Sequence, residues 1–282
     1  MHIGLGLPIA DPRALPDWAR RADSGPFSTL GLLDRLVYHN PEPLVTLALL
    51  AGITSRIKLQ TEVLLAPLRE PVLLAKQAAT LDRLCGGRLV LGLGVGGRAD
   101  DHEASGTDIR TRGRRLDHHI DLMRRLWAGE PYSATCGPIG PTPTSPVGPE
   151  LLFGGYWLAA LRRVARYGGG FLAAVAPDSA EPQFDTVRGL WRDHGRPGQP
   201  RIVAQVNVAL GPEPVIDDAR ANISAYYRFL GNADLITSGL LTTPQHIRST
   251  ITQFHALGVD EVMLYCFGRD PDQADRIADI IG

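Results

Sequence analysis

The chain alternates short, uninterrupted apolar runs with longer segments whose apolar residues recur every three or four positions. An uninterrupted apolar run is typical of a strand buried on both faces, and the longer spacing is typical of an amphipathic helix. On this basis we expect eight strands, at 2–8, 29–33, 56–65, 88–95, 151–153, 170–175, 201–210 and 259–266.

The segments between these strands are predicted to be helices, at 12–24, 41–54, 71–85, 113–128, 157–167, 180–194, 212–230, 244–257 and 271–281. Strands joined in turn by helices form a parallel sheet, and eight of them favour a closed barrel over an open sheet. We therefore predict an α/β fold, a single (β/α)8 TIM barrel over residues 1–282. The segments 98–112, 129–149 and 231–243 are expected to be excursions around the mouth, at the C-terminal face of the strands.

Composition narrows the function classes. With 282 residues, 44% of them hydrophobic, the chain can bury a full core, and its net charge of −1 gives no reason to expect nucleic acid or a membrane as partner. Cys85, Cys136 and Cys266 are far apart and odd in number, which favours reduced thiols over a disulfide framework. The chain shows neither a signal-peptide pattern nor an apolar stretch of membrane length, so we expect a cytoplasmic protein.

The run from Gly92 to Gly97, GLGVGG, is the most informative stretch. It matches the dinucleotide fingerprint G-x-G-x-x-G, but that fingerprint requires a helix immediately after it. The following residues, 98–112, are polar without an apolar period, so we expect a long loop until about Arg114. A strand end without side chains lets a flat ligand lie close to the backbone, which favours a cofactor wall over a merely tight exit from a barrel strand.

Three motifs are especially specific: LAPLREP at 65–71, LAKQAATLD at 74–82 and GGRL at 86–89. With them, and with shorter matches at 41–44, 92–97, 126–127 and 153–155, the chain resembles the bacterial-luciferase-like family of flavin- or deazaflavin-dependent oxidoreductases. The resemblance is continuous from about residue 28 to 170 and weaker beyond. The fold of that family is a (β/α)8 barrel, in agreement with the strand count.

The resemblance implies FMN or coenzyme F-420, a deazaflavin, as cofactor, with its ring at the C-terminal mouth of the barrel. Deazaflavin members carry a non-proline cis peptide on the third strand, and that position falls here on Glu62–Val63. The cofactor phosphate would lie where a helix begins after the fifth strand, because free N–H groups there bind anions. The implied contacts are Glu62, Val63, Gly94, Gly96, Gly97, Arg98, Gly154, Gly155, Tyr156 and Trp157.

The candidate catalytic residues are Asp34, Arg35, His39 and Glu62. Asp34 ends the second strand, and many relatives follow it with a catalytic His. Arg35 stands there instead, stays protonated, and would hold an anionic group of substrate or cofactor. His39 is the best proton shuttle by its ordinary pKa, and an exposed loop histidine is the equal alternative. Asp34 itself has a loop cap as its alternative reading.

Glu62 stands where relatives usually carry a small residue. Beneath an apolar ring its pKa would rise and it would act as an acid, whereas pointing outward it would pair with Arg69 or Arg98. The run Asp100–Glu103 is interpreted as solvated loop and not as a metal site, since four adjacent side chains do not converge without a defined turn. His118 and His119 are expected on the surface.

Together these features predict an oxidoreductase acting on a small organic molecule or peptide. It would work by hydride transfer with coenzyme F-420 or by monooxygenation with reduced FMN. A flavin reductase or an F-420-recycling enzyme is the expected partner, and a homodimer the expected assembly. Two alternatives stay open: a barrel that binds flavin but has lost turnover, motivated by Arg35 and Glu62, and a non-redox sugar-phosphate enzyme.

Overall fold

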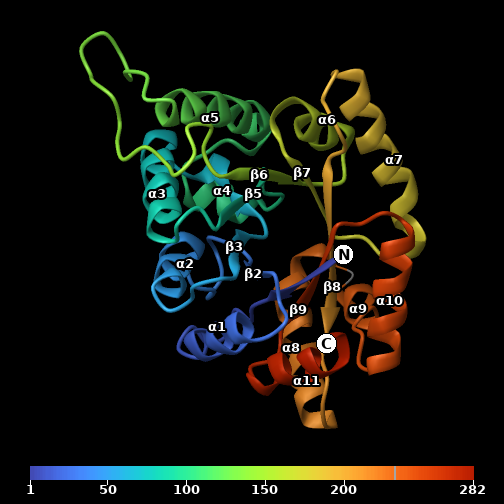
Figure 1. Ribbon diagram of the computed structural model, residues 1–282. Helices are drawn as coiled ribbons and strands as arrows, with labels where there is room; N and C mark the ends of the chain where they lie inside the picture. The colour runs from blue at the N-terminus through green and yellow to red at the C-terminus, as the bar shows by residue number, and fades with distance from the viewer. Residues whose placement is uncertain (232) are drawn as a thin grey trace.

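The strands close into a parallel barrel in a computed structural model that describes residues 1–231 and 233–282. Neighbours follow the order β3-β2-β1-β9-β8-β7-β6-β5-β4, and pairing of β3 with β5 closes the ring. The predicted (β/α)8 barrel is confirmed (Figure 1). Its strands are β1 (His2–Gly6), β2 (Thr29–Leu32), β3 (Lys58–Thr61), β4 (Leu64–Leu65), β5 (Leu89–Gly94), β6 (Glu150–Gly154), β7 (Gly170–Ala173), β8 (Arg201–Val208) and β9 (Glu261–Cys266).

The third predicted strand is divided into β3 and β4. Both pieces pair with β5, Leu59 opposite Leu89 and Leu64 opposite Leu93, so they form one continuous side of the barrel. The peptide bond between the two pieces, Glu62–Val63, is cis, as expected. Nine named strands therefore make the eight positions of the ring.

Helices surround the strands (Figure 1). Every predicted helix is present, most within three residues of its expected ends, and a further one lies inside the 231–243 excursion, whose residue 232 is outside the described part of the chain. The helices are α1 (Leu15–Ser24), α2 (Pro43–Ala51), α3 (Pro71–Leu84), α4 (Ala99–Ala104), α5 (Arg112–Trp127), α6 (Leu158–Tyr167), α7 (Pro177–Asp193), α8 (Glu213–Tyr227), α9 (Ala233–Ser238), α10 (Pro244–Ala256) and α11 (Asp272–Ile281), with 3-10 turns η1 (Ala66–Leu68), η2 (Ile109–Thr111) and η3 (Arg228–Leu230).

The expected long loop after Gly97 is wrong, because α4 begins at Ala99. This helix shows no apolar period because the side chains on its buried face are polar. Asp101 and His102 are each only 1% exposed. The Asp101 carboxylate accepts hydrogen bonds from the backbone N–H groups of Leu36 (3.2 Å) and Val37 (2.6 Å). These residues are therefore not solvated, and α4 holds the loop that follows β2.

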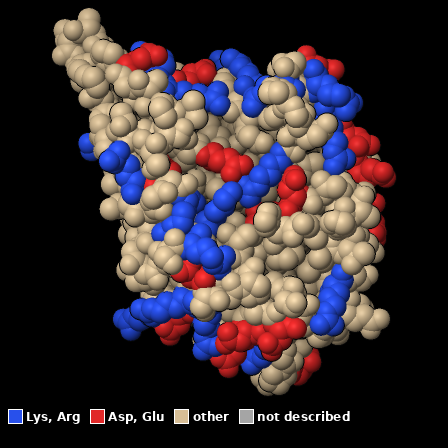
Figure 2. Space-filling view, viewed as in Figure 1, with Lys and Arg blue, Asp and Glu red and all other residues tan. Residues whose placement is uncertain are grey.

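The expectation that 129–149 borders the mouth is also wrong. Helix α5 returns from the C-terminal end of β5 to the other end of the barrel, so the segment after it leads into the start of β6 at Glu150. It projects from the body of the molecule (Figure 1, Figure 2), and the sequence of residues 131–149 contains no Lys, Arg, Asp or Glu. Thr144 N–H donates to the Asp82 carboxylate at 2.7 Å and ties its base to α3.

The expectation that His119 lies on the surface is also wrong, because this residue of α5 is only 2% exposed. It follows Leu116 by three residues and precedes Met123 by four, so it lies on the apolar stripe of the helix. Burial and then the nearby Arg115 lower the pKa of His119 to about 4, which keeps the ring neutral in the core.

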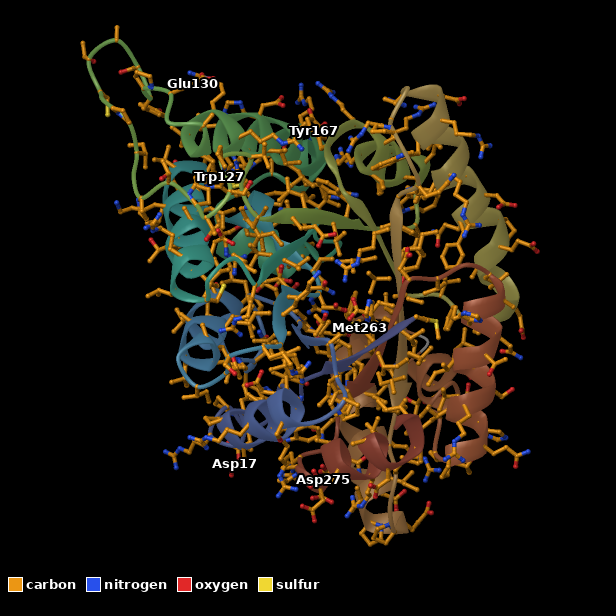
Figure 3. The ribbon with its side chains drawn as sticks, in the orientation of Figure 1. Asp17, Trp127, Glu130, Tyr167, Met263 and Asp275 are labelled. Carbon is orange, nitrogen blue, oxygen red and sulfur yellow. The ribbon has the colours of Figure 1, made fainter. Side chains whose placement is uncertain are left out.

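The interior of the barrel is filled by side chains from its strands, namely Val90, Leu152, Leu172, Val203 and Met263, with Val63 packed against them. Met263 lies in the middle of the ring (Figure 3). Glycine at position 4 makes room for it, because a Cβ there would overlap the Met263 sulfur. A filled interior leaves room for a ligand only at the ends of the barrel.

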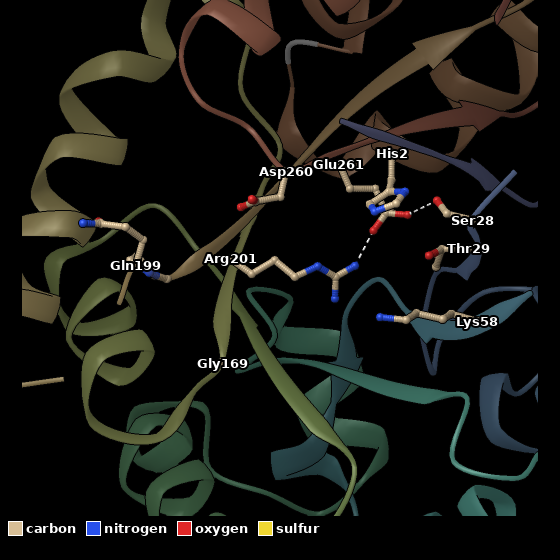
Figure 4. Close-up of a pocket in the computed structure, with 10 residues that line it drawn as sticks. His2, Ser28, Thr29, Lys58, Gly169, Gln199, Arg201, Asp260 and Glu261 are labelled. Carbon is tan, nitrogen blue, oxygen red and sulfur yellow. Dashed lines mark hydrogen bonds and ion pairs between the residues drawn. The ribbon is translucent and has the colours of Figure 1, made fainter. Parts of the chain in front are cut away.

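Charged groups close the N-terminal end of the barrel (Figure 4). Arg201 bonds to Glu150 at 2.8 Å and to Glu261, whose carboxylate also accepts from the Ser28 hydroxyl. Lys58 lies 3.8 Å from Glu150. Residues at this end of the fold usually serve stability and not chemistry.

None of the helices in the two described ranges combines the length and apolar character needed to cross a membrane.

Candidate active site

A cavity of about 370 Å³ opens at the C-terminal ends of the strands, and its wall is mostly apolar. Most of the residues that the sequence assigned to cofactor contact line this cavity, although their role in binding stays a prediction. They are Glu62, Val63, Gly94, Gly96, Gly97, Gly154, Gly155, Tyr156 and Trp157.

Val63 lies at the centre of the cavity floor. Its side chain packs between two glycines on neighbouring strands, where a Cβ at Gly154 would be 2.9 Å from one Val63 methyl and a Cβ at Gly94 would overlap the other. Leu172 and Val203 continue the same surface. The glycines at strand ends thus let one apolar side chain rise into the cavity and present a flat wall beside it.

Helix α6 begins at the edge of this floor. Gly155 has φ +142°, and a Cβ there would be 2.6 Å from the Cβ of Ala160, so glycine is required for the turn from β6 into the helix. Trp157 is the N-cap, and no side chain among the described residues caps this turn by a hydrogen bond. The first-turn N–H groups and the helix dipole at this end attract an anion.

Four polar residues on the cavity wall were missed by sequence reasoning: Arg112, Gln183, Gln205 and Tyr227. Arg112 is the first residue of α5 and adds a positive charge beside the cavity. Gln205 interrupts the apolar run of β8 at an inward position, and this break was the signal available in the sequence. Nothing in the local sequence marks Arg112, because its place follows from how α5 packs.

Glu62 is 5% exposed and lies on the cavity wall. It accepts a hydrogen bond from the Gln60 amide and packs over Gly31 of β2. Burial raises the pKa of Glu62 to about 8, the Gln60 hydrogen bond opposes the rise, and the charge of Glu261 adds to it. The carboxyl is therefore a neutral acid near pH 7, and it does not pair with Arg69 or Arg98.

Asp34 lies beside the cavity and is only 6% exposed. Its carboxylate accepts from the Leu65 N–H at 2.8 Å and from the Arg69 guanidinium at 2.7 and 3.2 Å. This arrangement is the capping alternative considered above, since Asp34 fixes the end of β4. Through Leu65 it positions the floor that contains Val63.

Arg35 lies under an aromatic cluster beside the mouth. Its guanidinium is 4.7 Å from the ring centre of Tyr38, 5.2 Å from that of Tyr226 and 5.5 Å from that of Phe229, and it donates to the Tyr226 carbonyl at 3.1 Å. These contacts join the loop after β2 to α8 and η3. His39 is exposed and stacks on Tyr38 at 4.3 Å.

Arg98 takes part in the same junction. Its guanidinium lies 4.3 Å from the Phe229 ring centre and forms an ion pair with Asp100. The structure therefore brings Arg35 and Arg98 together at the rim, while Glu62 and the glycines line the cavity. Inside the cavity, Arg112 and the α6 N-terminus are groups that can attract an anion.

Comparison with known proteins identifies the family to which this chain belongs. The sequence model of luciferase-like monooxygenases matches residues 2–273. The chain spans just over half the length of the first curated relatives it matches, which are uncharacterised mycobacterial proteins. One of them, from Mycobacterium bovis, is 35% identical over 55% of this chain and 56% of its own length. An F-420-dependent glucose-6-phosphate dehydrogenase of Kribbella flavida is 31% identical over 57% of this chain and 53% of its own.

Solved structures show the same fold. An F-420-dependent secondary alcohol dehydrogenase in complex with an F-420-acetone adduct superposes with a TM-score of 0.83 at 17% identity, over 99% of this chain and 98% of its own. A type II Baeyer-Villiger monooxygenase component of Pseudomonas putida, in complex with FMN, superposes with a TM-score of 0.77 at 17% identity, over 100% and 96%.

Proposed function

Because this chain belongs to the luciferase-like monooxygenase family, we propose that it is an oxidoreductase that binds coenzyme F-420 or FMN at the C-terminal mouth of its barrel. The observation that carries the proposal is the cavity floor. Val63 stands between Gly94 and Gly154 there, and the wall beside it is mostly apolar and lacks side chains at these two glycines, a shape that suits a flat ring.

The residues present fit the ring and an anionic group of such a cofactor. Val63, Gly94 and Gly154 would contact the ring, and the α6 N-terminus after Gly155 would receive a phosphate. Arg112 would pair with a further anionic group of the cofactor side chain. When bound, the cofactor would supply the redox chemistry, and the protein would supply orientation and exclusion of water.

Glu62 is the proposed proton donor. A carbonyl or alkene that is reduced by hydride must also gain a proton, and a buried neutral carboxyl on the wall is suited to give one. Gln60 keeps that carboxyl in place by its hydrogen bond. This acid favours hydride transfer with coenzyme F-420, and monooxygenation with reduced FMN is the second candidate because FMN enzymes share the fold.

The partners follow from the cofactor. Coenzyme F-420 would be reduced again by a separate enzyme, and FMN would need a flavin reductase. The proposed homodimer is supported by exposed apolar side chains on two neighbouring helices, Val45 and Leu49 on α2 and Leu73 and Leu84 on α3. A cytoplasmic location is part of the same proposal, and the three free cysteines support it.

Cofactor titration of a cavity variant tests the proposal. Gly97 lines the cavity with φ outside the left-handed region, and a Cβ at Gly97 would meet open space among the described residues. Gly97→Phe should therefore fold normally and weaken binding of coenzyme F-420 or FMN at least tenfold, followed by fluorescence and absorbance. The matched control is Gly137→Phe in the projecting segment, where a Cβ also meets open space.

Each outcome decides between the candidates. Tight binding of F-420 to the wild type and the control, with loss in Gly97→Phe, supports the hydride-transfer enzyme, and the same result with reduced FMN supports the monooxygenase. Equal binding by all three proteins would place the cofactor elsewhere. Binding without turnover of any carbonyl or alkene tested would leave a barrel that has lost activity.

A further inference from the structure

Large apolar side chains are exposed on segments that border the mouth of the barrel. Three segments carry them: the loop after β2, the turn from β6 into α6, and the η3–α9 excursion after β8. We call this set the apolar collar. Its members are exposed and are Leu36, Val37, Tyr156, Trp157, Leu158, Phe229, Leu230 and Leu235.

The collar surrounds one opening. The Arg35 guanidinium lies 5.5 Å from the Phe229 ring, which joins the loop after β2 to η3. Tyr156 and Trp157 line the same cavity as Tyr227, the residue just before η3. The three segments therefore meet around the cavity, and their apolar surface continues into the apolar wall below.

Trp157 is the most exposed member, at 81%, although it is an indole ring. Water-exposed apolar patches larger than isolated side chains mark sites where a ligand or partner binds. Among the cations near the mouth, Arg98 is paired with Asp100 and Arg35 is enclosed by aromatic rings. Arg112 lines the cavity below, where it is assigned to the cofactor, and Arg228 is exposed on η3. The rim that an entering molecule meets is thus mostly apolar.

We propose that the substrate is an extended, uncharged apolar molecule whose reacting end enters the cavity and whose remaining length lies on the apolar collar. This inference rests on the proposed function, since it places the reacting end beside the cofactor. A small molecule is favoured over a docked protein because the collar encircles the opening of a cavity and is continuous with its wall. A sugar or a charged metabolite would leave this surface uncovered.

Tryptophan fluorescence offers a direct test. Of the four tryptophans, Trp18, Trp127 and Trp191 are at most 4% exposed, so acrylamide quenching reports chiefly on Trp157. The probes are straight-chain ketones from 2-butanone to 2-decanone, added to the protein loaded with its cofactor. We expect protection of Trp157 from quenching and an affinity that rises up to about fourfold with each added methylene until the collar is covered.

Variants locate the effect. Leu235→Ser keeps the reporter, and it should weaken binding of the longer ketones several-fold while leaving 2-butanone unchanged. Leu84→Ser is the matched control, because Leu84 is 65% exposed on α3, outside the collar.

The result that would overturn the inference is an affinity independent of chain length, or equal losses in Leu235→Ser and Leu84→Ser. Cofactor titration of the same proteins separates this failure from failure of the proposed function. If the cofactor binds normally and the ketones show no length dependence, the substrate class is wrong and the oxidoreductase proposal stands.

Discussion

Glu62 is a carboxyl held in an apolar wall, and its protonation links the chemistry of the site to the stability of the fold. The sequence predicted its position and its raised pKa from the neighbouring motifs, but not what holds it. Gln60, two residues earlier on the same inward face, donates the hydrogen bond. A polar residue inside a buried strand run was the available signal.

The stability of the protein should fall as the pH rises because of this one group. The folded-state pKa of Glu62 is about 8, above the ordinary value of 4.5 for the unfolded chain, so between these values the folded state holds one more proton. The wild type should therefore lose about 1.4 kcal/mol of unfolding free energy per pH unit relative to Glu62→Gln from about pH 5 to pH 8.

Urea unfolding at a series of pH values measures this difference. Glu103→Gln is the control, because Glu103 is an exposed carboxyl on α4 and its removal should leave the pH dependence unchanged. Parallel curves for the wild type and Glu62→Gln would show that Glu62 ionises freely, and the role of this residue as a neutral acid would be lost.

Arg35 shows the limit of reasoning from single residues. Its position after Asp34 suggested contact with a ligand, yet its guanidinium packs against the rings of Tyr38, Tyr226 and Phe229. The Tyr226 carbonyl, which accepts a hydrogen bond from Arg35, is 191 positions away in the sequence. No local pattern predicts such a contact, because only the closed barrel brings the loop after β2 to η3. The aromatic residues near the end of α8 are visible in the sequence, but nothing in the sequence shows that they contact Arg35.

At the scale of elements, the break between β3 and β4 fits against β5 because Gly94 leaves room for the Val63 side chain. The sequence identified the glycine run as a wall, and the structure shows that Val63 is what the wall accommodates. Gly94 is thus required by packing inside the protein as well as by any ligand.

A methyl group at position 94 should destabilise the fold. The Cβ of Gly94→Ala would overlap a Val63 methyl, and overpacking of this kind costs about 1–3 kcal/mol. Val63→Ala in the same chain removes that methyl, so the double variant should be more stable than the sum of the two single effects predicts. Denaturant unfolding of the four proteins measures the coupling.

Gly97→Ala controls for the general effect of removing a glycine, because a Cβ there would meet open space among the described residues. Its unfolding free energy should change by no more than about 0.5 kcal/mol. Strict additivity of Gly94→Ala and Val63→Ala would contradict the packing described here.

Helix α4 was missed for a related reason. Periodicity detects helices whose buried face is apolar, whereas α4 buries Asp101 and His102 through hydrogen bonds. The two acidic residues of its first turn, Asp100 and Asp101, favour a helix N-terminus and were the signal that could have found it.

At the scale of the whole molecule, the two ends of the barrel differ in chemistry. The N-terminal end is closed by ion pairs around Arg201 and Glu261, and the C-terminal end holds an apolar cavity. The alternation of strands and helices was enough to predict the barrel, because each element has its own period. The end of the barrel at which a loop lies depends on whether it follows a strand or a helix. The segment 129–149 follows helix α5 and therefore lies at the N-terminal end, and not at the mouth as predicted.

Hydrogen exchange followed by mass spectrometry, with and without coenzyme F-420 or reduced FMN, tests the central claim most directly. The claim is that the cofactor lies at the C-terminal mouth, so bound cofactor should slow exchange in peptides covering 62–65, 94–97 and 154–160, which contain the cavity floor and the start of α6. Protection confined instead to peptides around 199–201 and 260–261, at the charged N-terminal end, would contradict it.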